Sequence, residues 1–317
     1  TFDYPSFTHK FRIDNLAYFI SEYFDSSQGN SYNNNVEIVI TTESGILFTE
    51  ICKLLINRCS FLNYFEMTEI PENYSNDLNY NDLIGSIIKL PGASKVFNKL
   101  ETFVSATTND ELTRPLYESL ALFCNNILNI DLIFKSESQV QLLEKLISVQ
   151  KRLENLSIIG NSNINCNSLL WVLVSKKETL ESLRLKSVDF YHFEEKSSPI
   201  GQFTSLKKLY IEYCLLYKSD SLFFASLFTQ LSSFHYIYSI FSLNVYSQEF
   251  IIKILETANT NLKNICLDLF LTIPSDTFST ILNYCTKITE LNLLNLSLEQ
   301  IITIFNNNFK ELRRFHL

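Results

Sequence analysis

Apolar residues recur along the chain in one short pattern, in which a first apolar residue is followed by a second three positions later and a third after two more. The spacing of two between the last two positions is typical of a strand with one buried face. Only Ser105, the third member of its copy, is not apolar. The sequence therefore predicts ten short strands. Their patterns begin at Leu62, Leu100, Ile127, Leu153, Leu180, Leu206, Leu231, Leu262, Ile288 and Leu312.

The copies recur at a nearly constant interval. Seven of the nine successive spacings lie between 24 and 27 residues, and a period of about 20–29 residues is typical of leucine-rich repeats. Helical patterns fall between the strands, at 136–151, 219–230, 247–259, 275–285 and 297–308. We therefore expect an α/β fold, a leucine-rich-repeat solenoid of about ten strand–helix repeats. Its parallel sheet would line the concave side of a ribonuclease-inhibitor-like arc.

Two of these helices carry start signals. Ser136 precedes Gln139 by three residues and Ser297 precedes Gln300 by three, which is the spacing of a capping box. In 247–259, four apolar residues lie on one helical face and predict the buried side of that helix. They are Phe250, Ile251, Ile254 and Leu255.

The N-terminal part follows the pattern less closely. Residues 1–60 are expected to form a helical segment and a degenerate first repeat, with helices at 13–24 and 46–58 and a strand at 36–41. Residues 61–317 form the repeat array, with an insertion near 68–95 whose Asn-rich core, 71–82, predicts a loop. A second loop, 190–202, replaces a helix.

Composition narrows the possible partners. The net charge of −8 disfavours nucleic acid, which is bound by basic surfaces. Residues 221–248 carry no Asp, Glu, Lys or Arg, as a membrane-spanning segment would. Several polar residues interrupt this segment, however, and the repeat pattern explains its composition better than a membrane span. We expect neither nucleic acid nor membrane as a partner.

The seven cysteines form no CxxC pair, and three of them, Cys59, Cys124 and Cys285, occupy one repeat position near a helix end. They are interpreted as small buried side chains rather than disulfides or a metal site. This usage indicates a reducing compartment, cytoplasmic or nuclear.

No catalytic motif is found. No two of the six glycines lie closer than seven residues to each other, which excludes a phosphate-binding glycine loop, and neither HExxH nor GxSxG occurs. A Cys–His dyad formed only in space stays open. We expect no enzyme activity, no catalytic residue, no cofactor and no metal.

The residues between the buried strand positions point to the concave face. Three cations cluster there beside aromatic and acidic side chains, which suits a protein hot spot or an acidic or phosphorylated peptide. A solvated face with chance clustering is the alternative. The candidate partner-binding residues are Arg184, Lys186, Lys208, Tyr210, Glu212 and His235.

The segments "CSFLNYFEM", "LISVQKRLENLSI", "KKETLESLRL" and "FTSLKKLYIEYC" resemble the leucine-rich region of fungal F-box/leucine-rich-repeat-like proteins. The resemblance implies the substrate-recognition region of a cullin-based SCF ubiquitin ligase receptor. An F-box would recruit the Skp adaptor, and the repeats would hold a protein substrate. This sequence shows no F-box pattern before the repeats, so the adaptor is expected only if an F-box is encoded upstream. The alternatives are a free-standing intracellular scaffold or effector and a secreted recognition domain.

Overall fold

The computed structural model describes most of the chain and divides it into two compact units, Thr1–Arg152 and Leu153–Leu317. The described residues are 10–27, 42–68, 87–106, 110–134, 136–160, 164–188, 202–214, 228–237, 245–269, 273–306 and 309–316.

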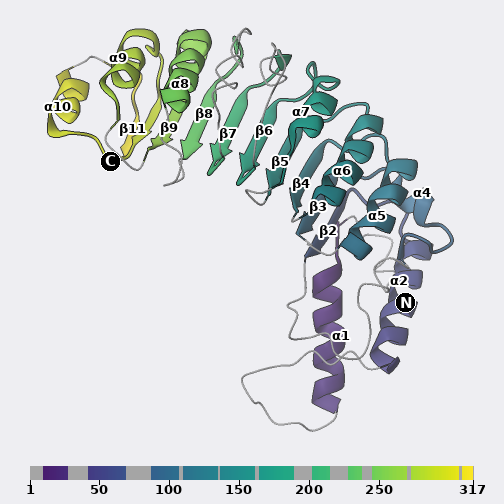
Figure 1. The fold of residues 1–317 in the computed structure, drawn as a ribbon. Coiled ribbons are helices and arrows are strands. Elements are labelled where there is room, and N and C mark those ends of the chain that lie inside the picture. The colour runs from purple at the N-terminus through teal and green to yellow at the C-terminus, as the bar shows by residue number, and fades with distance from the viewer. Residues whose placement is uncertain are drawn as a thin grey trace. The chain divides into compact units, whose positions relative to one another are not determined.

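The first unit contains four parallel strands in sequence order. They are β1 (Lys10–Arg12), β2 (Tyr64–Thr68), β3 (Thr102–Ala106) and β4 (Asn129–Ile133). Its helices include two long ones near its start and three beside β3 and β4, and α5 packs against α6 (Figure 1). They are α1 (Ile13–Ser27), α2 (Thr42–Arg58), α4 (Ala93–Phe97), α5 (Asp110–Phe123) and α6 (Glu137–Val149).

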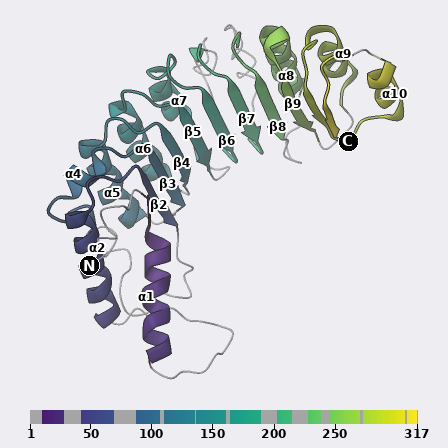
Figure 2. The same cartoon turned by 180° about the vertical axis from the view of Figure 1, so that it is seen from behind.

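The second unit contains seven parallel strands, again in sequence order. They are β5 (Asn155–Ile159), β6 (Ser182–Lys186), β7 (Lys208–Glu212), β8 (Ser233–Ile237), β9 (Asn264–Asp268), β10 (Glu290–Leu293) and β11 (Arg314–His316). Its helices gather along one side of these strands (Figures 1 and 2). They are α7 (Asn167–Val174), α8 (Val245–Ala258), η5 (Asn259–Asn261), α9 (Ser275–Tyr284) and α10 (Leu298–Asn306).

The repeat prediction is confirmed. Each of the ten predicted strands is present, as β2 to β11, and its second pattern residue lies within it. From β2 to β10 that residue and the third one are buried, as Leu183 and Leu185 illustrate at 0% and 1% exposure. Within each unit, burial of these residues on successive strands makes a continuous core that no single repeat could form alone. The fold class is therefore the expected α/β leucine-rich-repeat array with a parallel sheet.

A shared carbonyl joins each repeat to the next within its unit. Two consecutive backbone N–H groups at the start of a strand donate to one carbonyl oxygen of the preceding repeat, at 2.8–3.1 Å. Lys207 and Lys208, for example, both donate to Glu181 O. The arrangement recurs because equivalent positions stack once per repeat, and it holds the strands in register. The acceptor carbonyls belong to Asn63, Glu101, Glu154, Glu181, Lys207, Ser232, Lys263 and Thr289.

The expected helix starts are also found. Ser297 and Gln300 form the full capping box, with Ser297 N donating to Gln300 Oε1 at 3.0 Å and Gln300 N donating to Ser297 Oγ at 3.2 Å. Ser136 Oγ accepts from Gln139 N at 3.4 Å. The four apolar residues predicted to form the buried face of α8 are 2% exposed or less.

The N-terminal expectations are met in part. Helices appear where 13–24 and 46–58 were predicted, as α1 and α2. The edge beside β2 is occupied by β1, which the sequence did not predict. The predicted strand 36–41, the loop core 71–82 and the helix 219–230 up to residue 227 lie outside the described residues. The loop 190–202 lies outside them except at residue 202. At the end of the expected insertion near 68–95, a helix, Ala93–Phe97, begins and buries Val96 and Phe97 in the core.

The seven cysteines are free thiols, and all but Cys266 are buried. Cys59, Cys124 and Cys285 occupy equivalent positions, since each backbone N–H donates to the carbonyl four residues earlier at a helix end. In the next repeat after Cys124 the same position is Gln150, 1% exposed. Its side chain accepts from Ile127 N at 2.9 Å and donates to Cys124 O at 3.0 Å, so a buried amide links two repeats.

Candidate protein-binding face

The strands of the second unit present alternate side chains on the face opposite the buried ones. On β6 the exposed or half-exposed residues are Ser182, Arg184 and Lys186. They alternate with the buried Leu183 and Leu185. We call the surface formed by these alternate side chains of β6 to β10 the open face. Strand register arranges them in three rows. The first row is Ser182, Lys208, Ser233, Asn264 and Glu290; the middle row is Arg184, Tyr210, His235, Cys266 and Asn292; the third is Lys186, Glu212, Ile237 and Asp268.

All six residues predicted to bind a partner lie on this face, but two of the three cations share one carboxylate. Arg184 donates to Glu212 Oε1 through Nε at 2.9 Å and lies 2.8 Å from it through Nη2. Lys186 Nζ lies 3.8 Å from Glu212 Oε2. The Glu212 side chain is only 6% exposed, against 44% for Arg184 and 35% for Lys186. Glu212 is therefore a buried counter-ion that orients Arg184.

Lys208 lies apart from this group. It is exposed, in the first row, opposite Ser182 and Ser233. Among the described residues it has no ion-pair partner, so its charge is directed to solvent. The predicted basic cluster is therefore an oriented Arg184, a Lys186 that faces Glu212, and a separate Lys208.

Two rings occupy the centre of the middle row. The rings of Tyr210 and His235 lie 5.6 Å apart between centroids, inclined at 54°. Burial lowers the pKa of His235; the Glu212 carboxylate opposes this shift, Arg184 adds to it and Asp268 opposes it. A lowered pKa favours the neutral imidazole near neutral pH, which makes the centre of the open face aromatic and uncharged.

Cys266 is next to His235 in the middle row. Burial raises the pKa of its thiol to about 11, and Asp268, Glu212 and Glu290 add to the shift. This is the opposite of what a nucleophilic thiolate requires. Although the sequence left open a Cys–His dyad formed in space, this thiol is held protonated.

Tyr213 is a residue that the sequence reasoning missed. It follows the last residue of β7, is 42% exposed, and has a φ of 55°. Lys186 Nζ lies 5.7 Å from the centre of its ring. Left-handed backbone is uncommon for a bulky residue and departs from the strand alternation on which the prediction relied. Ser187, at the equivalent position after β6, also has a positive φ, of 52°.

The first unit carries a second charged group that was not predicted. Arg12 Nη2 lies 3.1 Å from Glu66 Oε1, between neighbouring strands β1 and β2. The Tyr64 hydroxyl donates to Glu66 Oε2. Burial and this hydrogen bond raise the pKa of Tyr64 to about 12. The sequence alone could not pair Arg12 with Glu66, because β1 and β2 become neighbours only in the folded chain.

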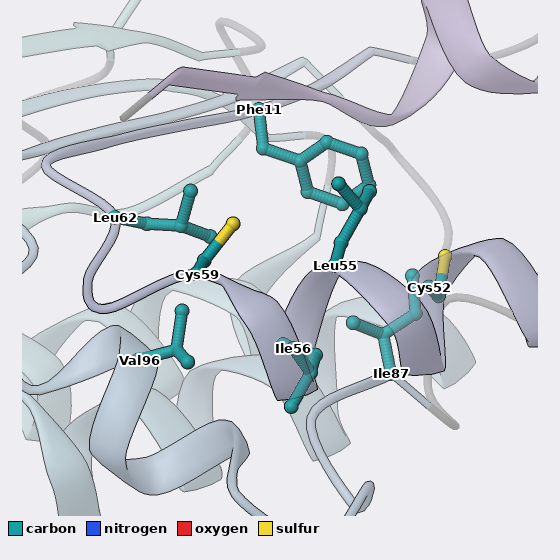
Figure 3. A pocket seen from close by; sticks show the side chains of 8 residues that line it. All are labelled: Phe11, Cys52, Leu55, Ile56, Cys59, Leu62, Ile87 and Val96. Atoms are coloured by element: carbon teal, nitrogen blue, oxygen red, sulfur yellow. The ribbon is translucent and has the colours of Figure 1, made fainter. Parts of the chain in front are cut away.

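A small apolar hollow lies within the first unit, where β1, α2 and α4 meet (Figure 3). Its volume of about 10 Å³ is close to the minimum for one water molecule, and its lining offers a water no polar side chain. It is therefore a gap in the core rather than a ligand site. Its lining residues are Phe11, Cys52, Leu55, Ile56, Cys59, Leu62, Ile87 and Val96.

Within the described ranges, no three His, Cys, Asp or Glu side chains gather as metal ligands. No helix among those residues is both long and apolar enough to cross a bilayer. A scan against models of known protein families and a search of curated proteins found no match to this chain.

Proposed function

We propose that this chain is a protein-binding repeat array and that the open face is its contact surface. The observation that carries the proposal is the oriented Arg184, whose register partner is Tyr210. The His235 ring lies against Tyr210, and Tyr213 lies beside Lys186. Arg and Tyr are enriched among residues that dominate binding energy. An arginine already oriented by a buried carboxylate loses less conformational freedom when a partner binds. The proposal assigns no catalysis to this face.

The finer proposal is that the array holds the substrate of an SCF-type ubiquitin ligase receptor. It rests on the resemblance to F-box/leucine-rich-repeat-like proteins, in which repeats bind the substrate and an F-box binds the Skp adaptor. The seven free cysteines support an intracellular, reducing location, cytoplasmic or nuclear.

The contact surface can be tested by site-specific photo-crosslinking in cells. A photoreactive amino acid replaces Ser233, in the first row of the open face on its middle strand β8, or Lys253, on the exposed side of α8. We expect a discrete adduct from position 233 that is absent at 253 and is competed by the purified partner once that partner is identified. Equal adducts at both positions, or none at 233, would contradict the proposal.

The ligase role needs a separate test on the complete gene product. Co-purification with the Skp adaptor, together with ubiquitination of the protein cross-linked at position 233, would support the receptor proposal. Cross-linking at 233 without adaptor binding would leave a free-standing scaffold or effector.

A further inference from the structure

The charges of the open face are separated by sign along the array. Strands β6 and β7 carry Arg184, Lys186, Lys208 and Glu212, three cations and one carboxylate, for a formal charge of +2. The open-face positions of β9 and β10 carry Asp268 and Glu290, for −2. Between these strands, β8 contributes only Ser233, His235 and Ile237, and His235 is held neutral. We call the two ends the basic pole and the acidic pole.

The same separation occurs in two rows independently. In the third row, Lys186 on β6 is three strands from Asp268 on β9. In the first row, Lys208 on β7 is three strands from Glu290 on β10. Neighbouring strands lie about 4.8 Å apart, so each cation is about 14 Å from its opposite charge.

This spacing matches an extended peptide that crosses the strands. Four residues of extended chain span about 13 Å, and residues i, i+2 and i+4 point to one side. An acidic side chain at one end and a basic side chain four residues away would therefore reach the two poles together. In the third row the side chain between them would lie near Ile237 on β8. The uncharged rings of Tyr210 and His235 are beside this position, in the middle row.

The ion pairs already present on the open face would allow a partner's charged side chains to bind at the two poles. Glu290 lies 3.8 Å from Arg314, and their side chains are 38% and 71% exposed, so the pair is weak and open to solvent. Glu212, in contrast, is buried beneath Arg184 and would stay in place. A partner anion would then meet the outward side of Arg184, Lys186 and the solvent-directed Lys208.

We infer that the open face binds an extended segment of a partner protein in which an acidic and a basic side chain are four residues apart, with an aromatic or aliphatic residue midway. The acidic residue lies over the basic pole and the basic residue over the acidic pole. The inference rests on the proposed protein-binding function and specifies the chemistry of the segment bound. The anion is a carboxylate or a phosphorylated hydroxyl, since both have oxyanions that Arg and Lys bind.

The test is a selection from a displayed library of random ten-residue peptides against the purified chain. We expect enriched peptides to carry opposite charges four residues apart, in either order, with an apolar residue between. Synthetic copies with Asp, Glu or phosphoserine at the acidic position then distinguish the two anion sources by affinity. Their binding should weaken as ionic strength rises.

Charge reversal supplies the specific control. Lys208→Glu should weaken binding of a selected peptide about tenfold, the equivalent of about 1.4 kcal/mol. Changing the acidic residue of that peptide to Lys should restore its binding to the variant. Lys287→Glu makes the same charge change in the loop between α9 and β10 and should leave affinity unchanged. Lys208 is chosen over Arg184 because it has no buried partner to destabilise.

Each outcome decides the inference. Peptides enriched without the charge spacing, or unaffected by Lys208→Glu, would overturn it while leaving the protein-binding proposal intact if position 233 still cross-links. A failure to enrich any peptide would also overturn it. The cross-linking experiment at 233 and 253 decides the proposed function separately, so the two failures are distinguishable.

Discussion

Arg184 contacts one oxygen of Glu212 through both Nε and Nη2, at 2.9 and 2.8 Å, from a neighbouring strand and two residues out of register. The direct register partner of Arg184 is Tyr210. The guanidinium therefore reaches diagonally past Tyr210 to a carboxylate that is almost completely buried. Arg184, one of the three cations predicted to form a basic cluster, is therefore held in a fixed orientation by its own counter-ion, Glu212.

Removing the charge of Glu212 should destabilise the protein. Glu212→Gln keeps the size of the side chain but weakens a buried, charge-assisted contact, so we expect the free energy of unfolding to fall by about 1–3 kcal/mol. Chemical denaturation measures the change. The matched control is Glu181→Gln, because Glu181 pairs with Lys207 at 2.6 Å while both side chains are almost half exposed. That loss should be below about 1 kcal/mol. Equal losses would mean that burial gives the Glu212 pair no special role.

The repeat register can be tested at Leu183, which is fully buried. Leu183→Asp places an unpaired carboxylate in the core and should lower the free energy of unfolding by at least about 3 kcal/mol. Ser182→Asp, one residue earlier and on the open face, should change it by less than about 1 kcal/mol. Thermal melts of both variants compare them directly. A wild-type melt for Leu183→Asp would refute the burial pattern of β6.

His235 should make stability depend on pH. Its folded pKa lies below the ordinary value of 6.5 because of burial, so below 6.5 the unfolded chain binds more protons than the folded chain. The free energy of unfolding should therefore fall as pH decreases through 6.5 toward the lowered pKa, and this contribution should be constant above 6.5. Urea denaturation of the wild type and of His235→Asn across this window measures the difference. A difference that does not change with pH would contradict the lowered pKa.

The thiols should react slowly in the folded protein. Burial raises the pKa of Cys52, Cys124, Cys214 and Cys285 to about 12, while half-exposed Cys266 is at about 11. Near pH 8 only about one Cys266 in a thousand is a thiolate. We expect slow alkylation at Cys266 first, seen by mass spectrometry and abolished by Cys266→Ser. All seven thiols should react in denaturant, and rapid native labelling at Cys124 would contradict its burial.

Gln150 should be needed for the packing of its repeat. Gln150→Met fills a similar volume but leaves Ile127 N and Cys124 O without their side-chain partner. Because unpaired buried polar groups are costly, we expect a loss of about 2 kcal/mol or more in the free energy of unfolding. Val149→Met, on the exposed neighbouring position, is the control and should have little effect. A neutral result for Gln150→Met would show that the two backbone groups find other partners.

The sequence by itself determined the repeat architecture. The alternation that places Leu183 and Leu185 inside and Arg184 outside is local, and it recurs at a period that stacking must match. Ten strands, the helices α6, α8, α9 and α10, and the membership of the open face therefore follow from spacing alone. The helices α4, α5 and α7 were not predicted. The same reasoning identified Glu212 as a surface residue, because it has the outward position in its strand.

Only the tertiary structure decided how those outward side chains interact. Glu212 is buried because Arg184 and Lys186 extend over it from the next strand, and Tyr213 approaches Lys186 because its backbone turns left-handed after β7. Likewise β1 pairs with β2 across more than fifty residues of sequence. Periodicity reports which face a residue occupies, whereas the charge state and exposure of that residue depend on neighbours that only folding brings together.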